Sequence, residues 1–149
     1  MDAKKASTLI KKLAVDLGFA SCGVSNAEFL EDEAFKLDQW LNANNHGKMA
    51  YMANNFDLRT DPRKLFDGCK SVISLTFNYY PKQEQPHGVP KISRYAYGRD
   101  YHKVLKGKCK KLIKQMQTHF GDFAGRAFVD SAPIMDKVWA QKSGLGWVG

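Results

Sequence analysis

The sequence has 149 residues, and its 44% of hydrophobic and 26% of charged side chains exclude a disordered chain. Its 23 Lys and Arg residues against 15 Asp and Glu give a formal net charge of +8, which suits a polyanionic partner without requiring one. No apolar run reaches the ~18 residues of a membrane span, and the first residues are too polar for a secretory signal. We therefore expect one cytoplasmic domain with no membrane contact.

Cysteine and histidine spacing predicts no metal site in this chain. The 3 cysteines lie too far apart to form a C-x-x-C pair, which excludes a zinc knuckle and a self-contained iron–sulfur cluster. An odd, scattered set also excludes a disulfide framework, so we expect small buried thiols. The 4 histidines show neither H-x-x-x-H nor H-E-x-x-H spacing.

The first predicted elements are a helix, a strand and a second helix. Residues 2–18 favour a helix, because Asp2 can cap its start and apolar residues recur on one face. A short strand is expected over 19–24. The tetrapeptide 25–28 (SNAE) matches the capping box, which predicts that the second helix begins there and runs to about residue 44.

The central part of the chain carries the strongest strand signal. Residues 61–62 (DP) place a cap before a proline at the first helical position, which predicts a short helix. Residues 70–79 alternate β-branched and apolar side chains, as strands do. The Pro- and Gly-rich stretch 80–90 must be a loop, and 92–97 is a candidate for another strand.

The last third of the sequence predicts two helices around a short strand. Asp100 can cap a helix that runs to about residue 119. Residues 127–129 are a further strand candidate, and 134–142 favour a final helix. Three or four strands interleaved with four main helices predict an α+β (α/β layered) fold, with a mixed β-sheet flanked by helices.

Residues 144–149 (GLGWVG) satisfy the dinucleotide-binding pattern G-x-G-x-x-G. That pattern carries this chemistry only between a strand and a helix, whereas here it follows a predicted helix. The sequence also has no room for the acidic residue that would hold a ribose about twenty positions later. We therefore expect a helix end and a chain cut within an element, as in a fragment of a longer protein.

Two polar segments are candidates for a functional site. Asp130 follows a predicted strand and precedes a helix, where a carboxylate can face a cleft; the alternative is a helix cap. Residues 98–102 (GRDYH) are equally polar, with Asp100 as a cap and Tyr101 as a core residue in the alternative interpretation. The helix that follows carries lysines on one face, which is either solvated or a phosphate-binding surface. These lysines are Lys103, Lys106, Lys110 and Lys114.

Four longer segments of the sequence are distinctive: HGKMAYM, SVISLTFNYYP, ISRYAYGRDYHKVLKGKCKKL and FVDSAPIMDKVWAQKSGLGWVG. Together they closely resemble the N-terminal domain of epoxyqueuosine reductase. The similarity runs across nearly all of the chain. GRDYHKVL and VDSAP, followed by AQKSGLGWVG, are its most specific motifs.

The resemblance implies an oxidoreductase that uses cobalamin and iron–sulfur clusters to convert epoxyqueuosine to queuosine at the wobble position of tRNA. Residues 1–149 would form its N-terminal cobalamin-binding domain, which resembles cobalamin-processing and nitroreductase-like proteins. A ferredoxin-like domain with two 4Fe-4S clusters follows in the family, and its ligands are not in this chain. We accordingly expect a monomer that binds tRNA, with the present chain inactive alone.

The resemblance also implies roles for single residues. Asp130 matches the proposed proton donor of the family, and Asp130 and Ser93 fall where the family contacts cobalamin. Lys137 stands where an arginine is common in the same pocket. The positive charge is kept, but the bidentate hydrogen bonding of a guanidinium group is lost. Asn54 also replaces a frequent arginine, and no role is carried over to it.

Two other classes of function stay open at this point. One is a basic module that binds cobalamin or RNA and performs no chemistry. The other is a flavin-binding, nitroreductase-like protein, which the implied architecture would permit. A cluster-binding C-x-x-C-x-x-C-x-x-x-C-P segment in the longer reading frame would favour the reductase, and absorbance after addition of cobalamin or flavin would identify the flavoprotein.

Overall fold

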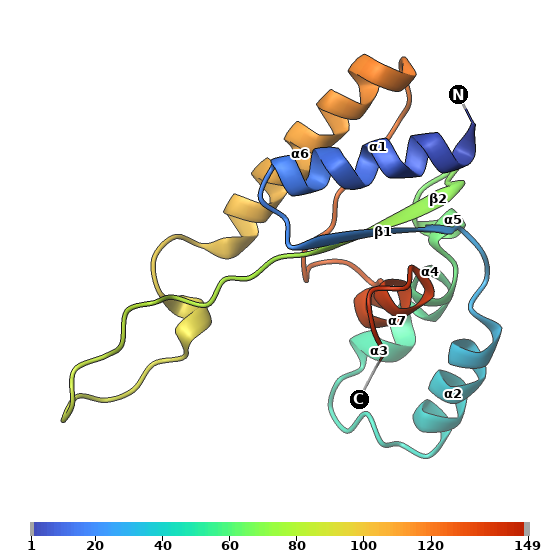
Figure 1. The fold of residues 1–149 in the computed structure, drawn as a ribbon. Coiled ribbons are helices and arrows are strands. Elements are labelled where there is room, and N and C mark those ends of the chain that lie inside the picture. Colours follow the sequence, from blue (N-terminus) through green and yellow to red (C-terminus); the bar gives the residue numbers. More distant parts are fainter. Residues whose placement is uncertain (1, 148–149) are drawn as a thin grey trace. The chain divides into compact units, whose positions relative to one another are not determined.

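A computed structural model describes residues 2–147 of the chain as a mixed α+β fold. Its elements in chain order are α1 (Ala3–Asp16), β1 (Ser21–Asn26), α2 (Glu31–Asn42), α3 (Tyr51–Asn54), α4 (Phe56–Thr60), α5 (Pro62–Leu65), β2 (Ser71–Thr76), a 3-10 helix η1 (Arg94–Ala96), α6 (Tyr101–Phe120) and α7 (Asp136–Lys142) (Figure 1). No helix in the described range is long and apolar enough to cross a membrane.

Strands β1 and β2 pair with each other in a two-stranded sheet. At one end Ala20 donates its N–H to the carbonyl of Thr76, and at the other Ala27 donates to the carbonyl of Lys70. The two strands therefore run antiparallel. The chain divides into two compact units. The first comprises residues up to Cys22 and residues 75–130, and the second comprises residues 23–74 and those from Ser131 onward.

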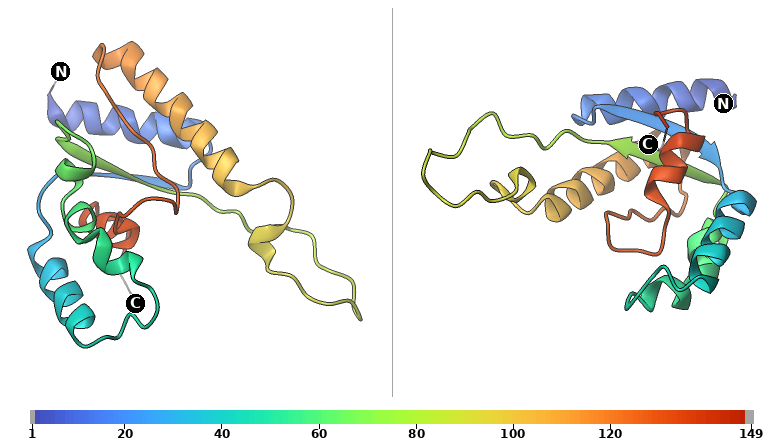
Figure 2. Two further views of the ribbon diagram at one scale, coloured as in Figure 1. Left: turned by 180° about the vertical axis from the view of Figure 1, so that it is seen from behind. Right: turned by 90° about the horizontal axis from the view of Figure 1, so that it is seen from below.

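In the first unit α1 packs against α6. The buried side chains include Ile10 and Ala14 of α1 and Leu112 and Met116 of α6. Asp2 caps α1, as predicted, by accepting a hydrogen bond from a backbone N–H of the first turn. Both views in Figure 2 show the chain leaving β2 in a long excursion before α6 begins, which agrees with the loop predicted over 80–90.

The second unit holds α2, the three short helices α3 to α5, and α7. Its buried residues include Leu30, Leu37 and Trp139. Gly23 is required by a close approach, because a Cβ atom there would lie 2.5 Å from the Cβ of Ser143. The Ser143 hydroxyl in turn lies 3.3 Å from the hydroxyls of Ser25 and Ser74, which ties the end of α7 to both strands.

The capping box predicted over 25–28 is wrong. Ser25 belongs to β1, and α2 begins only at Glu31, where the Leu30 side chain provides no cap. The carboxylate of Glu28 instead accepts a hydrogen bond from Lys142 at 2.8 Å, a residue far away in the sequence. Ser25 therefore lies in a strand and Glu28 forms an ion pair with Lys142, so neither side chain makes the local hydrogen bonds that the motif predicted.

Two predicted strands are also wrong. Residues 92–97 contain the short helix η1, and 127–129 form no strand, so the sheet in the described residues has two strands rather than three or four. Residues 70–79 do form a strand, shortened to β2. The final helix starts at Asp136 rather than at 134. Both segments are short, and a strand forms only where a partner strand completes its backbone hydrogen bonds.

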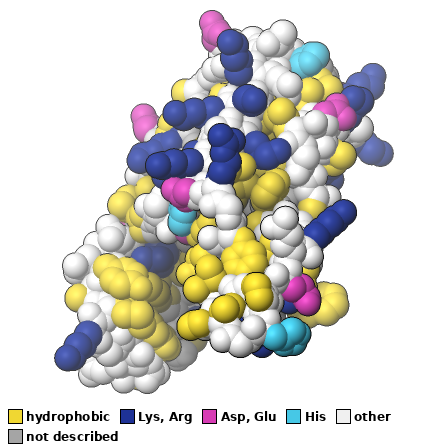
Figure 3. Space-filling model, turned by 90° about the vertical axis from the view of Figure 1, so that its left-hand side faces the viewer, with side chains coloured by type: hydrophobic (Ala, Val, Ile, Leu, Met, Phe, Trp, Pro, Cys, Tyr) yellow, Lys and Arg dark blue, Asp and Glu magenta, His cyan; other side chains and the backbone are white. Residues whose placement is uncertain are grey.

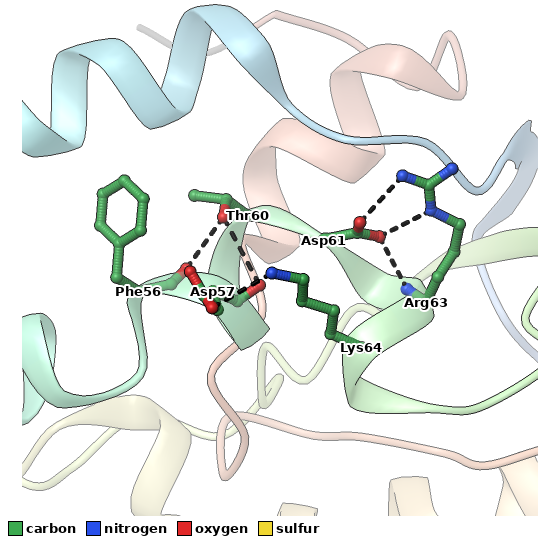
Figure 4. Close-up of polar contacts among 6 residues, drawn as sticks. All are labelled: Phe56, Asp57, Thr60, Asp61, Arg63 and Lys64. Atoms are coloured by element: carbon green, nitrogen blue, oxygen red, sulfur yellow. Dashed lines mark hydrogen bonds and ion pairs between the residues drawn. The ribbon is translucent and has the colours of Figure 1, made fainter.

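A cluster of polar contacts organises α4 and α5 (Figure 4). Thr60 is fully buried, accepts a hydrogen bond from the Leu30 N–H with its carbonyl, and donates its hydroxyl to the carbonyl of Phe56. Asp61 caps α5 as predicted, accepting from the Arg63 N–H at 3.0 Å. The Arg63 guanidinium donates two further bonds, at 2.8 Å each, to the two carboxylate oxygens of Asp61.

We expect this cluster to make the folded state sensitive to acid. The hydrogen bonds from Arg63 hold the pKa of Asp61 below its ordinary value of 3.8. A carboxyl group with a lowered folded-state pKa stabilises the fold above its unfolded pKa, and this contribution is lost as the pH falls through the folded pKa. Asp61→Asn keeps a capping side chain but removes the charge, so it should destabilise the protein at about pH 6 and lose most of that effect near pH 2.

Urea unfolding at both pH values measures this difference. Asp57→Asn is the control, because Asp57 pairs with Lys64 while both side chains are mostly exposed, and such pairs contribute little. A difference in the free energy of unfolding between wild type and Asp61→Asn that is the same at both pH values would contradict a stabilising charge on Asp61.

Candidate functional site

Asp130 has an unusual backbone conformation. Its φ is +49°, and it is one of two residues other than glycine with a positive φ in the described part of the chain. Asp and Asn are the residues that tolerate this left-handed region best. Asp130 does not cap a helix, since α7 begins at Asp136 with Met135 at its N-cap position. The cap interpretation of Asp130 is therefore wrong, and its side chain, 57% exposed, is available for another role.

The carboxylate of Asp130 is held from the start of α6. The Tyr101 hydroxyl donates a hydrogen bond to its Oδ2 at 2.6 Å, across 29 positions of sequence. The Nε2 atom of His102 lies 3.9 Å from the same oxygen. Asp100 caps α6, as predicted, by accepting from the His102 N–H at 3.0 Å, and this cap fixes where Tyr101 and His102 begin the helix.

The hydrogen bond to Asp130 dominates the electrostatics of Tyr101. It raises the pKa of Tyr101 to about 12, with smaller contributions from partial desolvation and the neighbouring phenols of Tyr79 and Tyr95. The phenol therefore stays protonated at neutral pH and acts as a hydrogen-bond donor. The alternative interpretation of Tyr101 as a core residue is wrong, because its hydroxyl faces a carboxylate and the residue is only half-buried.

Aromatic side chains surround the Tyr101 ring. Tyr79 stacks on it with centroids 5.8 Å apart, and Tyr95 meets it edge-on at 6.2 Å. Both neighbours are 55% exposed. The ring of His102 lies 4.1 Å from that of Tyr101. These contacts connect the loop after β2, the helix η1 and the start of α6 into one aromatic cluster around Asp130.

The two other predicted cofactor contacts, Ser93 and Lys137, are exposed and belong to different units of the chain. Ser93 precedes η1, next to the aromatic cluster, and its side chain makes no capping hydrogen bond there. Lys137 is an exposed residue of α7 and belongs to the second unit, so it is not assigned to the cluster around Asp130. Asn54 ends the short helix α3, also in the second unit.

The predicted lysine face lies on α6. Its residues, Lys103, Lys106, Lys110 and Lys114, are all exposed. Within residues 2–147 none of the four makes an ion pair with a carboxylate. Lys108, by contrast, turns inward and donates to the carbonyl of Leu17 at the end of α1. Figure 3 shows Lys and Arg side chains gathered on the upper part of the face it displays.

The surroundings of the three cysteines disfavour the thiolate form. Cys22, Cys69 and Cys109 are free thiols, and burial raises the pKa of each. A raised pKa disfavours the thiolate that nucleophilic and redox cysteines need. Among the described residues no group of three or more His, Cys, Asp and Glu could hold a metal ion.

The glycine-rich segment 144–149 follows α7, as the sequence predicts, and Gly144 ends that helix with a φ of +76°. Leu145 donates its N–H to the carbonyl of Ala140, which completes the helix end. The last two residues of the segment lie outside the described residues. A position after a helix does not fit the dinucleotide pattern.

Comparison with known proteins identifies similar sequences. A family model described as "Epoxyqueuosine reductase QueG, DUF1730" matches residues 59–131. The chain is 61% identical over 140 residues to the epoxyqueuosine reductase of Leadbetterella byssophila, covering 94% of this chain and 46% of that protein. It is 39% identical to that of Escherichia coli over 155 residues, covering 100% of this chain and 41% of that protein. The chain thus spans less than half the length of these curated relatives.

Solved structures share the fold. Epoxyqueuosine reductase from Streptococcus thermophilus superposes with a TM-score of 0.80 at 24% identity, covering 100% of this chain and 40% of that one. An epoxyqueuosine reductase solved with a tRNA-Tyr epoxyqueuosine-modified stem loop gives a TM-score of 0.76 at 19% identity, covering 98% and 40%. At these identities the comparison establishes the fold, which agrees with the α+β prediction.

The left-handed backbone at Asp130 predicts how substitutions there affect stability. Asp130→Asn should change the free energy of unfolding little, because Asn also adopts this region readily. Asp130→Val should cost roughly 1–2 kcal/mol more, since its Cβ branch clashes there. Urea denaturation of the two variants measures the difference, and equal stabilities would mean that the backbone at Asp130 is not held in this conformation.

Proposed function

Because this chain belongs to the epoxyqueuosine reductase family, we propose that the whole protein reduces epoxyqueuosine to queuosine at the wobble position of tRNA. Residues 1–149 would form its N-terminal cobalamin-binding domain, and two 4Fe-4S clusters in a ferredoxin-like domain would supply electrons. The protein would act as a cytoplasmic monomer. The observation that supports this proposal most directly is the exposed carboxylate of Asp130, held on one oxygen by Tyr101.

The residues around Asp130 fit cobalamin in chemical character. A corrin is a large, flat ring edged with amides, so its site needs apolar flat surfaces and groups that can hydrogen-bond. The exposed rings of Tyr79 and Tyr95 offer such surfaces, and the exposed Ser93 hydroxyl is available to an amide. Lys137, an exposed cation of α7, stays a predicted cobalamin contact that rests on the family resemblance and is not part of this cluster. When bound, cobalamin supplies a low-valent cobalt that delivers electrons to an epoxide carbon.

In the proposed reaction, the residues of this chain supply a proton to the epoxide oxygen. Conversion of the epoxide to an alkene consumes two electrons and two protons and releases the epoxide oxygen as water. That oxygen is a poor leaving group unless it is protonated as its bond to carbon breaks. Asp130 would donate this proton as a general acid, because its carboxyl group is exposed and anchored at a defined position.

The lysine face of α6 would bind tRNA phosphates. Its four ammonium groups are exposed and repeat along one side of a helix. Unpaired surface cations of this kind neutralise phosphates and release the counterions of the nucleic acid. The net charge of +8 has the sign that this contact requires.

The proposed general acid predicts the effect of Asp130→Asn. In the whole protein, loaded with cobalamin and prereduced, the single-turnover rate should fall about 10²–10⁴-fold, the usual contribution of a positioned general acid. Cobalamin occupancy, read from its visible absorbance, should stay unchanged. Mass spectrometry of nucleosides from epoxyqueuosine-containing tRNA measures the rate.

The same experiment tests the function itself. Wild-type protein should form queuosine only with cobalamin present. Conversion that depends on bound flavin instead would support a nitroreductase-like enzyme, and absence of conversion by fully loaded wild type would contradict the proposal. Equal rates for wild type and Asp130→Asn would be consistent with a reductase but would show that Asp130 is not its general acid.

Neutralising the lysine face should weaken tRNA binding. Each of the four single Lys→Gln variants should reduce the slope of log K against log salt by about 0.7–0.9, the change for one lost phosphate contact. Lys36→Gln, an exposed lysine on α2, is the control and should keep the wild-type slope. Filter binding of tRNA across a salt series gives the slopes; four unchanged slopes would make this face a solvated surface.

A further inference from the structure

The contacts of Asp130 divide its two carboxylate oxygens. The Tyr101 hydroxyl and the His102 ring both approach Oδ2, at 2.6 Å and 3.9 Å. Among the described residues Oδ1 makes no hydrogen bond and no ion pair. One oxygen is therefore anchored to the protein, while the other is free to meet a reacting group.

We propose that Tyr101 is the positioning residue for Asp130. Its phenol donates to Oδ2, so that the transferable proton resides on Oδ1, the oxygen left free for the substrate. The same hydrogen bond would stabilise the carboxylate left behind when the proton departs. This inference rests on the proposed reduction and adds Tyr101 to the residues that act in the proton transfer.

Proton transfer changes the charge of the carboxyl group. A hydrogen bond to a carboxylate is stronger than one to a neutral carboxylic acid. As the proton leaves Oδ1, negative charge develops on the carboxyl group and the bond from Tyr101 strengthens. An interaction that is stronger in the transition state than in the ground state accelerates the reaction.

The surroundings hold Tyr101 in place for this role. Its ring is held between Tyr79 and Tyr95, and the cap by Asp100 fixes the first turn of α6. The raised pKa of Tyr101, about 12, keeps the phenol protonated throughout the physiological range. His102 does not replace it, because its Nε2 lies beyond hydrogen-bond distance of Oδ2.

Tyr101→Phe is the direct test, since it removes the hydroxyl and keeps the ring. In the whole protein we expect kcat to fall about 10–100-fold, the range for losing a hydrogen bond to a charged group, with KM for the tRNA unchanged. Tyr51→Phe is the matched control, because Tyr51 is an exposed tyrosine of α3 whose hydroxyl contacts only Met49 among the described residues. It should keep wild-type kcat and KM.

A double-mutant cycle separates positioning from a general structural role. In the Asp130→Asn background, Tyr101→Phe should have almost no further effect, because it acts through the carboxyl group. An equal loss of kcat in both backgrounds, or a wild-type kcat in the single variant, would overturn the proposal. A rise in KM with unchanged kcat would also overturn it by making Tyr101 a binding residue.

A spectroscopic test does not depend on the reaction. In protein labelled at the phenolic carbon of tyrosine, Tyr101 should remain mostly protonated at about pH 11, whereas in Asp130→Asn a much larger fraction should be ionised, because the largest cause of the raised pKa is removed. Carbon-13 NMR reads this state. A Tyr101 signal that is the same in wild type and in Asp130→Asn would contradict the hydrogen bond between Tyr101 and Asp130. A changed signal in a protein that reduces no epoxyqueuosine would leave the pairing intact and contradict the proposed function alone.

Discussion

The hydrogen bond from Tyr101 to Asp130 is the contact on which the candidate site depends. It joins the first residue of α6 to a residue that no helix or strand holds, across 29 positions of sequence. Without it, the carboxylate at position 130 would be a freely rotating group on an exposed turn. With it, one oxygen is fixed, and the unusual backbone at that position gains a structural reason, since strained residues persist only where their surroundings hold them.

Helix α6 links this chemistry to the proposed contact with RNA. Its N-terminus carries Tyr101, and its exposed face carries the four lysines over the following turns. The buried face, with Leu112 and Met116, packs in the first unit together with α1. One rigid helix would therefore position a phosphate-binding surface relative to the group that supplies the proton, and its own N-cap, Asp100, fixes where that helix starts.

The sequence predicted those features that local chemistry controls. Asp2, Asp61 and Asp100 cap helices as expected, because a short acidic side chain before a helix satisfies free N–H groups nearby. The capping box at 25–28 failed because strand pairing and a distant lysine used the same residues. Asp130 and the polar segment 98–102 were each candidates from the sequence, whereas the contact between Asp130 and Tyr101 was not predicted. The two residues are far apart in the sequence, and no local pattern reports a contact of that kind.

In the proposed reaction, Oδ1 of Asp130 delivers the proton while Tyr101 holds Oδ2. A structure of the whole protein with cobalamin and an epoxyqueuosine-containing RNA stem loop tests it most directly. We expect Oδ1 to lie about 2.6–3.2 Å from the epoxide oxygen and the hydroxyl of Tyr101 still to contact Oδ2. An epoxide oxygen that meets Oδ2, or a different donor altogether, would contradict it.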